Sequence, residues 1–344
     1  MSAFDQLIDR AKQKPARVAL PEATDTRVIN AAISAAADGQ CIPVLVGNET
    51  SILKSADVAG LEGIEIIDTN SITADDALAT ALFERRKHKG MTLESAVEAL
   101  ADPLTYACTL VHVNQVDACV AGAEYATADV TRTAMQIVGT ASGASFVSSF
   151  FLMVMKHDFQ PLKDIVVFAD CALMVDPDAG QLAEIAMQTA HSTSALLGTT
   201  PRIGMLSFST AGSAKHPTVE KVQNAAAQVS QLCAESGACS DWKVIGDVQL
   251  DAAVIPDILK QKAPHFARQL GQDSGSVNLP NVLIFPTLDA GNIGYKLCER
   301  FGGCDAVGPV LQGLARPVND LSRGCKTEDI ERILAITSLQ AASL

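Results

Sequence analysis

The feature that most constrains this chain is the alternation of short apolar runs with longer segments of helical period along its length. Each apolar run has the length of a buried strand, and the segments between them carry apolar residues every three or four positions. Strands that alternate with helices in this way build crossover units, which produce largely parallel sheets with helices packed on their faces. The sequence therefore predicts an α/β fold.

The predicted strands include RVAL, IPVLVG, IEIID, DACVAGA, DIVVFAD, RIGMLSFS, VLIFPTL and DAVGPVLQG. The predicted helices include residues 25–38, 74–88, 92–101, 128–139, 178–197, 217–235, 291–301 and 327–338. The regular order is interrupted at TASGAS (140–145), which is followed by two adjacent strand-like runs that look antiparallel. A chain of 344 residues exceeds the roughly 250–300 residues at which single cores stop growing. We therefore expect two domains, with a boundary near 140–145.

The balance of charge limits the partners of this protein. The formal net charge is −13, and no long run of Lys and Arg occurs. Nucleic acid and anionic membranes both require a basic face, so we expect neither as a partner. The longest apolar run, FVSSFFLMVM, is far shorter than the ~20 residues of a membrane span, and charges occupy the place where a signal peptide needs an apolar core.

Nine cysteines are present, none in a CxxC pair and none at zinc spacing with histidine. An odd number cannot all pair, and most lie in apolar runs, where a thiol packs as a small hydrophobe. We therefore expect a soluble, cytoplasmic protein. Cys325, beside Arg323, could have a lowered pKa and act as a nucleophile. A packed thiol is favoured, because no histidine base lies nearby in the sequence.

The stretch PVNDLSRGC (317–325) predicts a turn bounded by proline and glycine, just before a helix. Fixing Arg323 in a turn costs roughly 2 kcal/mol of side-chain entropy, so we expect the turn to hold something anionic. Ser322 adds a hydroxyl beside it. Asp329 falls in the first turn of the next helix, where an acid also simply complements the helix dipole.

Two further stretches could bind an anion. In EYATADVTR, Thr127 and Arg132 lie near a helix N-terminus that follows a strand, and free N–H groups there form an anion cradle. The alternative is an ordinary N-cap with a solvated arginine. In FERRKHKGMT, Arg86 could reach the same ligand, or could belong to a solvated helix end whose cations favour the dipole.

The remaining loops carry weaker signals. FPTLDAGNIGYK (285–296) follows a strand, and its glycines allow a ligand to approach closely. SFSTAGSAKHP (207–217) could hold a phosphate or could be a surface loop. GxGxxG occurs nowhere, which removes the usual support for dinucleotide binding. Asp247 and Asp251 lie four apart, but in a run that looks like a strand, and no histidine cluster occurs, so no metal site is expected.

Taken together, LPEATDTRV, HKGMTLESA, VFADCALMVDPDAGQLAEIA, FPTLDAGNIGYK and LQGLARPVNDLSRG resemble the phosphate acetyltransferase family, which includes phosphate butyryltransferases. The similarity runs from about residue 15 to the C-terminus. The loop at 207–217 is similar to that of short bacterial enzymes associated with ethanolamine use, and the regulatory N-terminal region of long members is absent.

The resemblance implies reversible transfer of an acetyl group between CoA and inorganic phosphate, with CoA as a substrate and no further cofactor. It implies two three-layer α/β/α domains with mostly parallel sheets, similar to isocitrate and isopropylmalate dehydrogenases, with the active-site cleft between them. Residues 1–145 plus 312–344 would form domain I, on the phosphate side, and 146–311 an inserted domain II. The family commonly forms homodimers, so a homodimer is implied.

The resemblance also implies roles for individual residues. Ser322 and Arg323 match the catalytic Ser–Arg pair of the family, and Asp329 matches the acid proposed as base for the CoA thiol. Arg132 and Arg86 match arginines that bind the phosphoryl group.

Thr127 is expected to contact phosphate, although Ala126 stands where many relatives have serine, which puts one phosphate hydrogen bond in doubt. Further contacts to CoA or the acyl phosphate are expected from four residues: Asn292, Tyr295, Lys296 and Ser213.

The chemistry agrees with these roles. Exchange between thioester and acyl phosphate passes through a tetrahedral oxyanion, which Ser322 and nearby N–H groups can stabilise. A thiol near pKa 8.5 and an aspartate near 3.9 differ by roughly 4.6 units, about 6 kcal/mol. An unperturbed Asp329 would thus be a weak base, and we hypothesise that Arg323 stabilises the thiolate directly.

Three alternatives remain at this point. A phosphate butyryltransferase would use the same residues on a longer acyl chain. A decarboxylating dehydrogenase on the related fold would need a nicotinamide site and a cluster of metal-binding carboxylates, and neither is evident. A catalytically inactive, acetyl-CoA-binding regulatory protein would not need to keep Ser322, Arg323 and Asp329.

Overall fold

The structure is a computed structural model that describes residues 3–56, 58–71, 73, 75–156, 165–271 and 278–344. The chain divides into two compact units. Unit 1 comprises Met1–Phe4 and Ser148–Gly308, and unit 2 comprises Asp5–Val147 and Pro309–Leu344. Unit 2 is therefore built from two separate segments of the chain, and the second segment is only 36 residues long.

Unit 2 contains a five-stranded sheet with the strand order β11-β4-β1-β2-β3. Every pair of neighbouring strands is parallel. The strands are β1 (Arg17–Leu20), β2 (Ile42–Gly47), β3 (Glu65–Asp68), β4 (Ala118–Ala121) and β11 (Val318–Asp320). All residues of β4 and β11 are buried, as expected for a parallel sheet covered on both faces.

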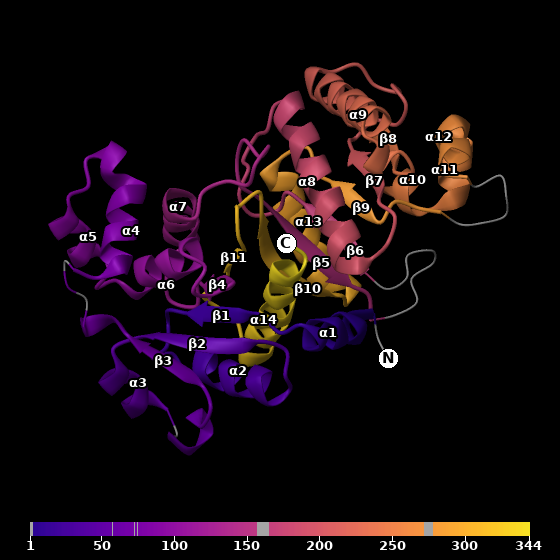
Figure 1. Ribbon diagram of the computed structural model, residues 1–344. Helices are drawn as coiled ribbons and strands as arrows, with labels where there is room; N and C mark the ends of the chain where they lie inside the picture. Colours follow the sequence, from indigo (N-terminus) through magenta and orange to yellow (C-terminus); the bar gives the residue numbers. More distant parts are fainter. Residues whose placement is uncertain (1–2, 57, 72, 74, 157–164, 272–277) are drawn as a thin grey trace. The chain divides into compact units, whose positions relative to one another are not determined.

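Helices cover this sheet. On one side, α2 (Thr26–Ala37) and α14 (Thr327–Ala342) pack against each other, and on the other α6 (Pro103–His112) lies against β1, β2 and β4 (Figure 1). The other α-helices of unit 2 are α1 (Ala3–Gln13), α3 (Glu49–Ser55), α4 (Ala77–Arg86), α5 (Leu93–Ala99) and α7 (Thr127–Ile137). Three short 3₁₀ turns lie at Val58–Leu61, Thr69–Ser71 and Lys87–Lys89.

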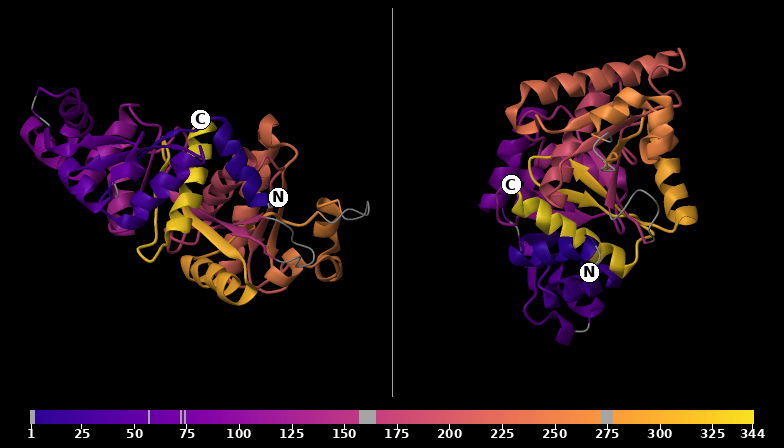
Figure 2. Two further views of the ribbon diagram at one scale, coloured as in Figure 1. Left: turned by 90° about the horizontal axis from the view of Figure 1, so that it is seen from below. Right: turned by 90° about the vertical axis from the view of Figure 1, so that its right-hand side faces the viewer.

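The two ends of the chain meet in unit 2. Helices α1 and α14 lie side by side (Figure 2), and the N–H of Ala16 donates to Ser338 Oγ at 2.9 Å. Asn319 of β11 is fully buried; it accepts from Leu311 N at 2.7 Å and donates to Thr337 Oγ1 and Gln340 Oε1. The short strand β11 is therefore held in place by the side-chain hydrogen bonds of Asn319 as well as by its backbone pairing with β4.

Unit 1 contains a six-stranded sheet with the order β10-β5-β6-β9-β7-β8. Its strands are β5 (Ser148–Val154), β6 (Ile165–Ala169), β7 (Arg202–Leu206), β8 (Lys243–Val248), β9 (Val282–Ile284) and β10 (Asp305–Gln312). The chain passes from unit 1 to unit 2 within β10, after Gly308. Strand β5 is antiparallel to β6, whereas the pairs β6–β9, β9–β7 and β7–β8 are parallel.

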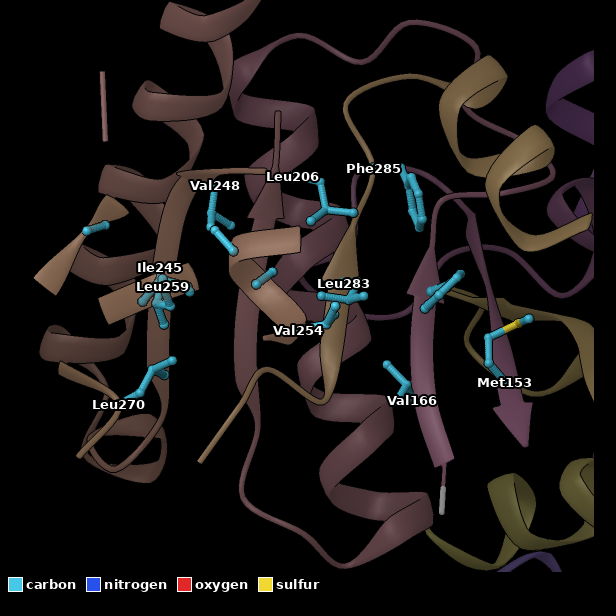
Figure 3. Close-up of a cluster of buried hydrophobic side chains, with 14 of the residues drawn as sticks. Met153, Val166, Leu206, Ile245, Val248, Val254, Leu259, Leu270, Leu283 and Phe285 are labelled. Carbon is cyan, nitrogen blue, oxygen red and sulfur yellow. The ribbon is translucent and has the colours of Figure 1, made fainter. Parts of the chain in front are cut away.

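The helices of unit 1 are α8 (Ala179–Leu197), α9 (Pro217–Glu235), α10 (Leu250–Val254), α11 (Pro256–Lys262), α12 (Pro264–Gln269) and α13 (Leu288–Gly302), with a 3₁₀ turn at Gly237–Cys239. Figure 3 shows the core between the sheet and helices α10 to α12, where Leu206, Val248 and Leu283 meet Val254 and Leu259. Burial of these aliphatic side chains holds the short helices on the sheet.

The predicted α/β fold with mostly parallel sheets is confirmed. The antiparallel pair expected after residue 145 is β5 with β6. One expectation was wrong: 317–325 is not a turn throughout, because Val318–Asp320 forms β11 and the turn begins only after it. No part of the described chain forms a helix long and apolar enough to cross a membrane.

Candidate functional site

Three loops meet at the carboxyl edge of the unit 2 sheet. They follow β1, β4 and β11, which are neighbours in the order β11-β4-β1. Because all three strands run parallel, their loops emerge on the same side. In parallel α/β sheets this edge is where ligands bind. The sequence stretches PEATD, GAEYAT and LSRG therefore lie together.

The carboxylate of Glu22 shapes the loop after β4. It is buried and accepts from the backbone N–H groups of Gly122 at 3.0 Å, Ala123 at 2.8 Å, Glu124 at 2.7 Å and Tyr125 at 2.7 Å. Hydrogen bonds to a charged acceptor are about twice as strong as neutral ones. One side chain from the first loop thus fixes the backbone of the second.

Arg27 connects all three loops. Its guanidinium pairs with Asp25 at 2.6 Å and donates to three carbonyl oxygens: Ala123 at 3.1 Å, Arg323 at 2.9 Å and Cys325 at 3.0 Å. The hydrogen bond from Arg27 holds the pKa of the Asp25 carboxyl below its usual value. The planar fork of an arginine suits several acceptors at once, which a lysine cannot match.

Asp320, the last residue of β11, is 1% exposed. Its Oδ2 accepts from the hydroxyl of Thr127 at 2.6 Å, and among the described residues its Oδ1 has no hydrogen-bond partner. Burial and the nearby charge of Glu22 raise the pKa of Asp320 to about 7, against the hydrogen bond from Thr127. Thr127 is the first residue of α7 and links its N-terminus to β11.

Gly122 is required where β4 ends. Its φ is +112°, and a Cβ there would lie 2.4 Å from Asp320 Oδ1 and 2.6 Å from Leu321 N. Any other residue would clash and would be strained. The close approach of the loops after β4 and β11 therefore depends on this glycine.

The predicted catalytic residues Ser322, Arg323 and Asp329 are all exposed and follow β11. The Gly324 N–H donates to Ser322 Oγ at 3.4 Å, within the turn. Asp329 accepts from Lys326 N at 2.9 Å, which caps α14. Asp329 therefore has the structural role that first-turn acids often have, whatever else it does.

Cys325 is a packed thiol, which is the interpretation that the sequence favoured. It is buried, and burial raises the pKa of its thiol, although Arg27 opposes that shift. A raised pKa reduces the thiolate fraction at neutral pH, which argues against a nucleophile here.

The predicted phosphate-binding residues lie on two helices. Thr127 and Arg132 are on α7, and Arg132, which is exposed, forms an ion pair with Asp129 one turn earlier. Arg86 is the last residue of α4, and its neighbour Arg85 donates to Ile137 O at 2.8 Å, which ties α4 to the end of α7. In the described part of the chain, no hydrogen bond joins Arg86 to Thr127.

The remaining predicted contacts lie in unit 1. Asn292 donates to Cys171 O at 3.0 Å and accepts from Lys296 Nζ at 2.8 Å. The ring of Tyr295 stacks on Phe151 with centroids 4.1 Å apart, so it contributes to packing, and burial raises its pKa.

Ser213 lies in the loop after β7 rather than on α13. Its Oγ accepts from Thr210 N at 3.1 Å and is 3.3 Å from Ser209 Oγ. Asp247, at the end of β8, accepts from Gly212 N at 3.2 Å and orders the same loop. The hydroxyls of this loop therefore bind the loop itself.

Three residues of the edge were not assigned from the sequence: Glu22, Arg27 and Asp320. The signal was present in part, because all three are charged: Glu22 follows the predicted strand RVAL, Arg27 lies at the start of the predicted helix 25–38, and Asp320 lies in the predicted turn 317–325. Their partners are about 100 to 300 positions away, and no local pattern reveals such pairs. Within the described ranges, no group of three or more His, Cys, Asp or Glu residues could hold a metal ion.

The fold and this edge define an α/β protein of the class that carries its functional loops beyond the carboxyl ends of parallel strands. Residues 2–338 match the family model described as phosphate acetyl/butaryl transferase. The chain is 44% identical over 341 residues to the phosphate acetyltransferase of Acetivibrio thermocellus, covering 99% of this chain and 98% of that one. The chain belongs to the phosphate acetyl/butaryl transferase family.

Solved structures agree. The EutD phosphotransacetylase from Staphylococcus aureus superposes with a TM-score of 0.86 at 38% identity, covering 98% of each chain. A 4-hydroxythreonine-4-phosphate dehydrogenase from Burkholderia phymatum superposes with a TM-score of 0.51 at 15% identity, covering 96% of this chain and 98% of that one. The second likeness concerns the fold alone, and it agrees with the predicted similarity to a dehydrogenase fold.

Proposed function

We propose that this protein is a phosphate acetyltransferase that catalyses acetyl-CoA + phosphate = CoA + acetyl phosphate. The observation that carries the proposal is the junction of β4 and β11. There the Thr127–Asp320 hydrogen bond ties the N-terminus of α7 to the strand that leads into Ser322 and Arg323. An acyl phosphate has two groups that need different donors, the phosphoryl anion and the carbonyl. The N-terminus of α7 suits the phosphoryl anion, and the turn with Ser322 and Arg323, which follows a neighbouring parallel strand, suits the carbonyl.

The phosphoryl group would lie at the N-terminus of α7. Ala126 supplies no side-chain cap, so the first N–H groups of that helix are available to an anion. Arg132 would add a bidentate contact, and Arg86 a further charge if it reaches the same ligand. Arg132 would have to exchange its ion pair with Asp129 for the phosphoryl oxygens.

The acyl transfer would proceed in a ternary complex by direct attack of the CoA thiolate on the carbonyl carbon of acetyl phosphate. The C–S bond forms first and gives a tetrahedral oxyanion; when this intermediate collapses, the C–O bond to phosphate breaks and phosphate leaves with the bonding electrons. Ser322 would donate to the tetrahedral oxyanion, and Arg323 would stabilise the thiolate. Asp329 would accept the thiol proton on Oδ1, while its Oδ2 keeps the 2.9 Å hydrogen bond from Lys326 N.

We propose further that CoA is a substrate, that no metal or other cofactor is needed, and that Asn292, Tyr295, Lys296 and Ser213 contact CoA or the acyl phosphate. The positive charge that a metal would supply is available from arginines. The likeness to acetyl-transferring relatives over nearly the whole chain favours acetyl phosphate over butyryl phosphate. We propose residues 1–145 plus 312–344 and 146–311 as the two domains.

We also propose a cytoplasmic homodimer. Eight of the nine cysteines are buried and all are free thiols, which suits a reducing compartment. On α13 only Gly291 is buried, and Ile293, Leu297 and Phe301 form an exposed apolar stripe, with Phe301 87% exposed. Such a stripe is typical of an interface. Sedimentation of wild type against Leu297→Glu/Phe301→Glu tests this: a wild-type monomer would contradict it.

The activity itself is tested by the formation of acetyl-CoA from CoA and acetyl phosphate, followed at the thioester absorbance. The assay includes EDTA and a parallel series with butyryl phosphate. We expect EDTA-resistant turnover that favours acetyl phosphate. Folded protein with no turnover on either substrate would support the catalytically inactive, acetyl-CoA-binding alternative. A preference for butyryl phosphate would support a phosphate butyryltransferase.

A further inference from the structure

The contact between Thr127 and Asp320 limits what Thr127 can do. A hydroxyl group has a single proton to donate. An ionised carboxylate is an acceptor only, so an ionised Asp320 takes that proton across the 2.6 Å contact. The oxygens of a phosphoryl dianion are also acceptors only. Thr127 therefore cannot donate to an ionised Asp320 and to a phosphoryl oxygen at the same time.

A proton on Asp320 removes this conflict. Protonated Asp320 can donate to Thr127 Oγ1 through the same contact, because a carboxylic acid has one O–H donor. The hydroxyl proton of Thr127 is then free to turn toward a ligand, and Thr127 is only partly buried. The reversal needs no movement of heavy atoms.

The surroundings of Asp320 favour the protonated form. The side chain is buried, and its Oδ1 has no partner among the described residues. The charged group that acts on it is Glu22, from the loop after β1, and the two carboxylates repel. Among the described residues no cation compensates for this repulsion. Arg27 is engaged with Asp25 and with the carbonyls of Ala123, Arg323 and Cys325. A Cβ at position 122 would lie 2.4 Å from Oδ1, so no side chain at this position can partner it.

A bound anion would add to this repulsion. A phosphoryl dianion at the N-terminus of α7 brings two further negative charges near Asp320, and a like charge nearby disfavours ionisation. Binding of the anion and protonation of Asp320 therefore support each other. By linkage, each must strengthen the other by the same factor.

We propose that Asp320 is a positioning residue that takes up a proton when the phosphoryl group binds, reverses its hydrogen bond with Thr127, and so frees the Thr127 hydroxyl to donate to the phosphoryl oxygen. This rests on the proposed function, because it requires the phosphoryl group to bind at the N-terminus of α7. The proton comes from solvent, and no covalent bond changes.

The test uses sulfate, because sulfate remains a dianion throughout the pH range in which phosphate itself titrates. Binding of sulfate to the full-length protein is measured by calorimetry between pH 6 and pH 9, in buffers of different ionisation enthalpy. The difference between buffers gives the number of protons taken up. At pH 8 we expect wild type to take up most of one proton, and its affinity to fall by about tenfold per pH unit above pH 7.

Three variants separate the outcomes. In Asp320→Asn the amide N–H₂ can donate to Thr127 permanently, so we expect binding to persist, proton uptake to vanish and the pH dependence to flatten. In Thr127→Val we expect weak binding. Thr131→Val is the matched control, because it removes a hydroxyl from the same helix, and we expect it to bind like wild type. Thermal denaturation checks that each variant is folded.

Two results would overturn the proposal, and they differ in what they leave standing. If Asp320→Asn takes up as many protons as wild type, while Thr127→Val and Arg132→Ala weaken binding, the proton device is wrong and the phosphoryl site stands. If Thr127→Val and Arg132→Ala leave sulfate binding unchanged, or if wild type binds no sulfate, the phosphoryl site itself is wrong.

Discussion

The guanidinium of Arg27 donates to the carbonyl oxygen of Arg323 at 2.9 Å, so the backbone of one arginine is held by the side chain of another. The side chain of Arg323 is thereby left exposed on a turn whose backbone is fixed. The same guanidinium also reaches the carbonyl of Ala123. Arg27 therefore supports two parts of the site: Arg323, which is proposed to stabilise the thiolate, and the loop that precedes α7.

Arg27→Lys should lower kcat far more than it lowers stability. A lysine keeps the charge beside Asp25, but it cannot reach the carbonyls of Ala123, Arg323 and Cys325 together. Misplacement of catalytic groups by about 1 Å can cost ~100-fold, so we expect a loss of between about tenfold and 100-fold. Steady-state kinetics with a parallel denaturant titration checks this. Arg17→Lys, at an exposed ion pair with Glu65, is the control, and equal kinetics in both variants would contradict the shared support.

Arg323→Ala should reduce turnover more than Asp329→Asn does. The hypothesis assigns thiolate stabilisation mainly to Arg323, and the structure gives Asp329 a second role as a cap of α14. An asparagine at this position keeps an acceptor for Lys326 N, so we expect the stability of Asp329→Asn to change by about 0.5–1 kcal/mol or less. Rates are compared from pH 6 to pH 9. Near-normal turnover of Arg323→Ala beside an inactive Asp329→Asn would reverse the assignment.

Glu22→Gln should destabilise the protein although it has nearly the same shape. The carboxylate receives four successive N–H groups, and an amide would replace one acceptor oxygen by a donor. Each unpaired buried donor costs about 1–3 kcal/mol. We expect a free energy of unfolding lower by roughly 2–4 kcal/mol, measured by chemical denaturation. Glu124→Gln, on an exposed neighbour, should have little effect.

Asp320→Asn should stabilise the protein at alkaline pH. The folded-state pKa of Asp320 is raised to about 7, so its contribution to stability is present below the unfolded value of about 3.9 and is lost as pH rises through about 7. Asparagine does not titrate, so the variant does not undergo this loss of stability with rising pH. The loss is up to about 4 kcal/mol when the folded and unfolded pKa values differ by about three. Denaturation of wild type and variant at pH 5 and pH 8.5 checks this. A stability difference that is the same at both pH values would count against the raised pKa.

Asp129→Asn and Arg132→Ala should change the KM for acetyl phosphate in opposite directions. Asp129 holds Arg132 in an exposed ion pair, so the phosphoryl group competes with this carboxylate for the guanidinium. Losing a charged hydrogen-bond donor costs about 1.5–3 kcal/mol, so KM should rise by about 10-fold to 100-fold in Arg132→Ala. In Asp129→Asn it should fall. An increase in both variants would show that Asp129 orients Arg132 instead of competing for it.

Much of the fold could be predicted because it rests on local patterns. Strand β2 begins and ends where the run IPVLVG does, and α9 spans residues 217–235 as expected, with Pro217 at its first position. Strand β11 could not be found this way, because three residues carry no periodicity and Asn319 looks unsuited to a core. That asparagine is fully paired there with Leu311, Thr337 and Gln340, which only the tertiary structure supplies.

The site could be predicted only in part, for the same reason. Ser322 and Arg323 stand out because they lie in a stretch bounded by proline and glycine just before a helix, and Thr127 because it opens a helix after a strand. The acid and the arginine that arrange them, Glu22 and Arg27, look like the first residues of an ordinary helix. Their function depends on which strands become neighbours, and strand order is not written in any single stretch of sequence.

The division of unit 2 between residues 5–147 and 309–344 has a consequence for synthesis. Arg27 and Arg323 are separated by 296 positions, so a ribosome adds the partner of Arg27 only 296 residues after Arg27 itself. Until then β4 has an open edge where β11 will lie, and a nascent chain carries the proposed phosphoryl-binding helix α7 without the turn that holds Arg323. We expect unit 2 to close only after residues 309–344 have left the ribosome, so that a chain still lacking them cannot turn over acetyl-CoA.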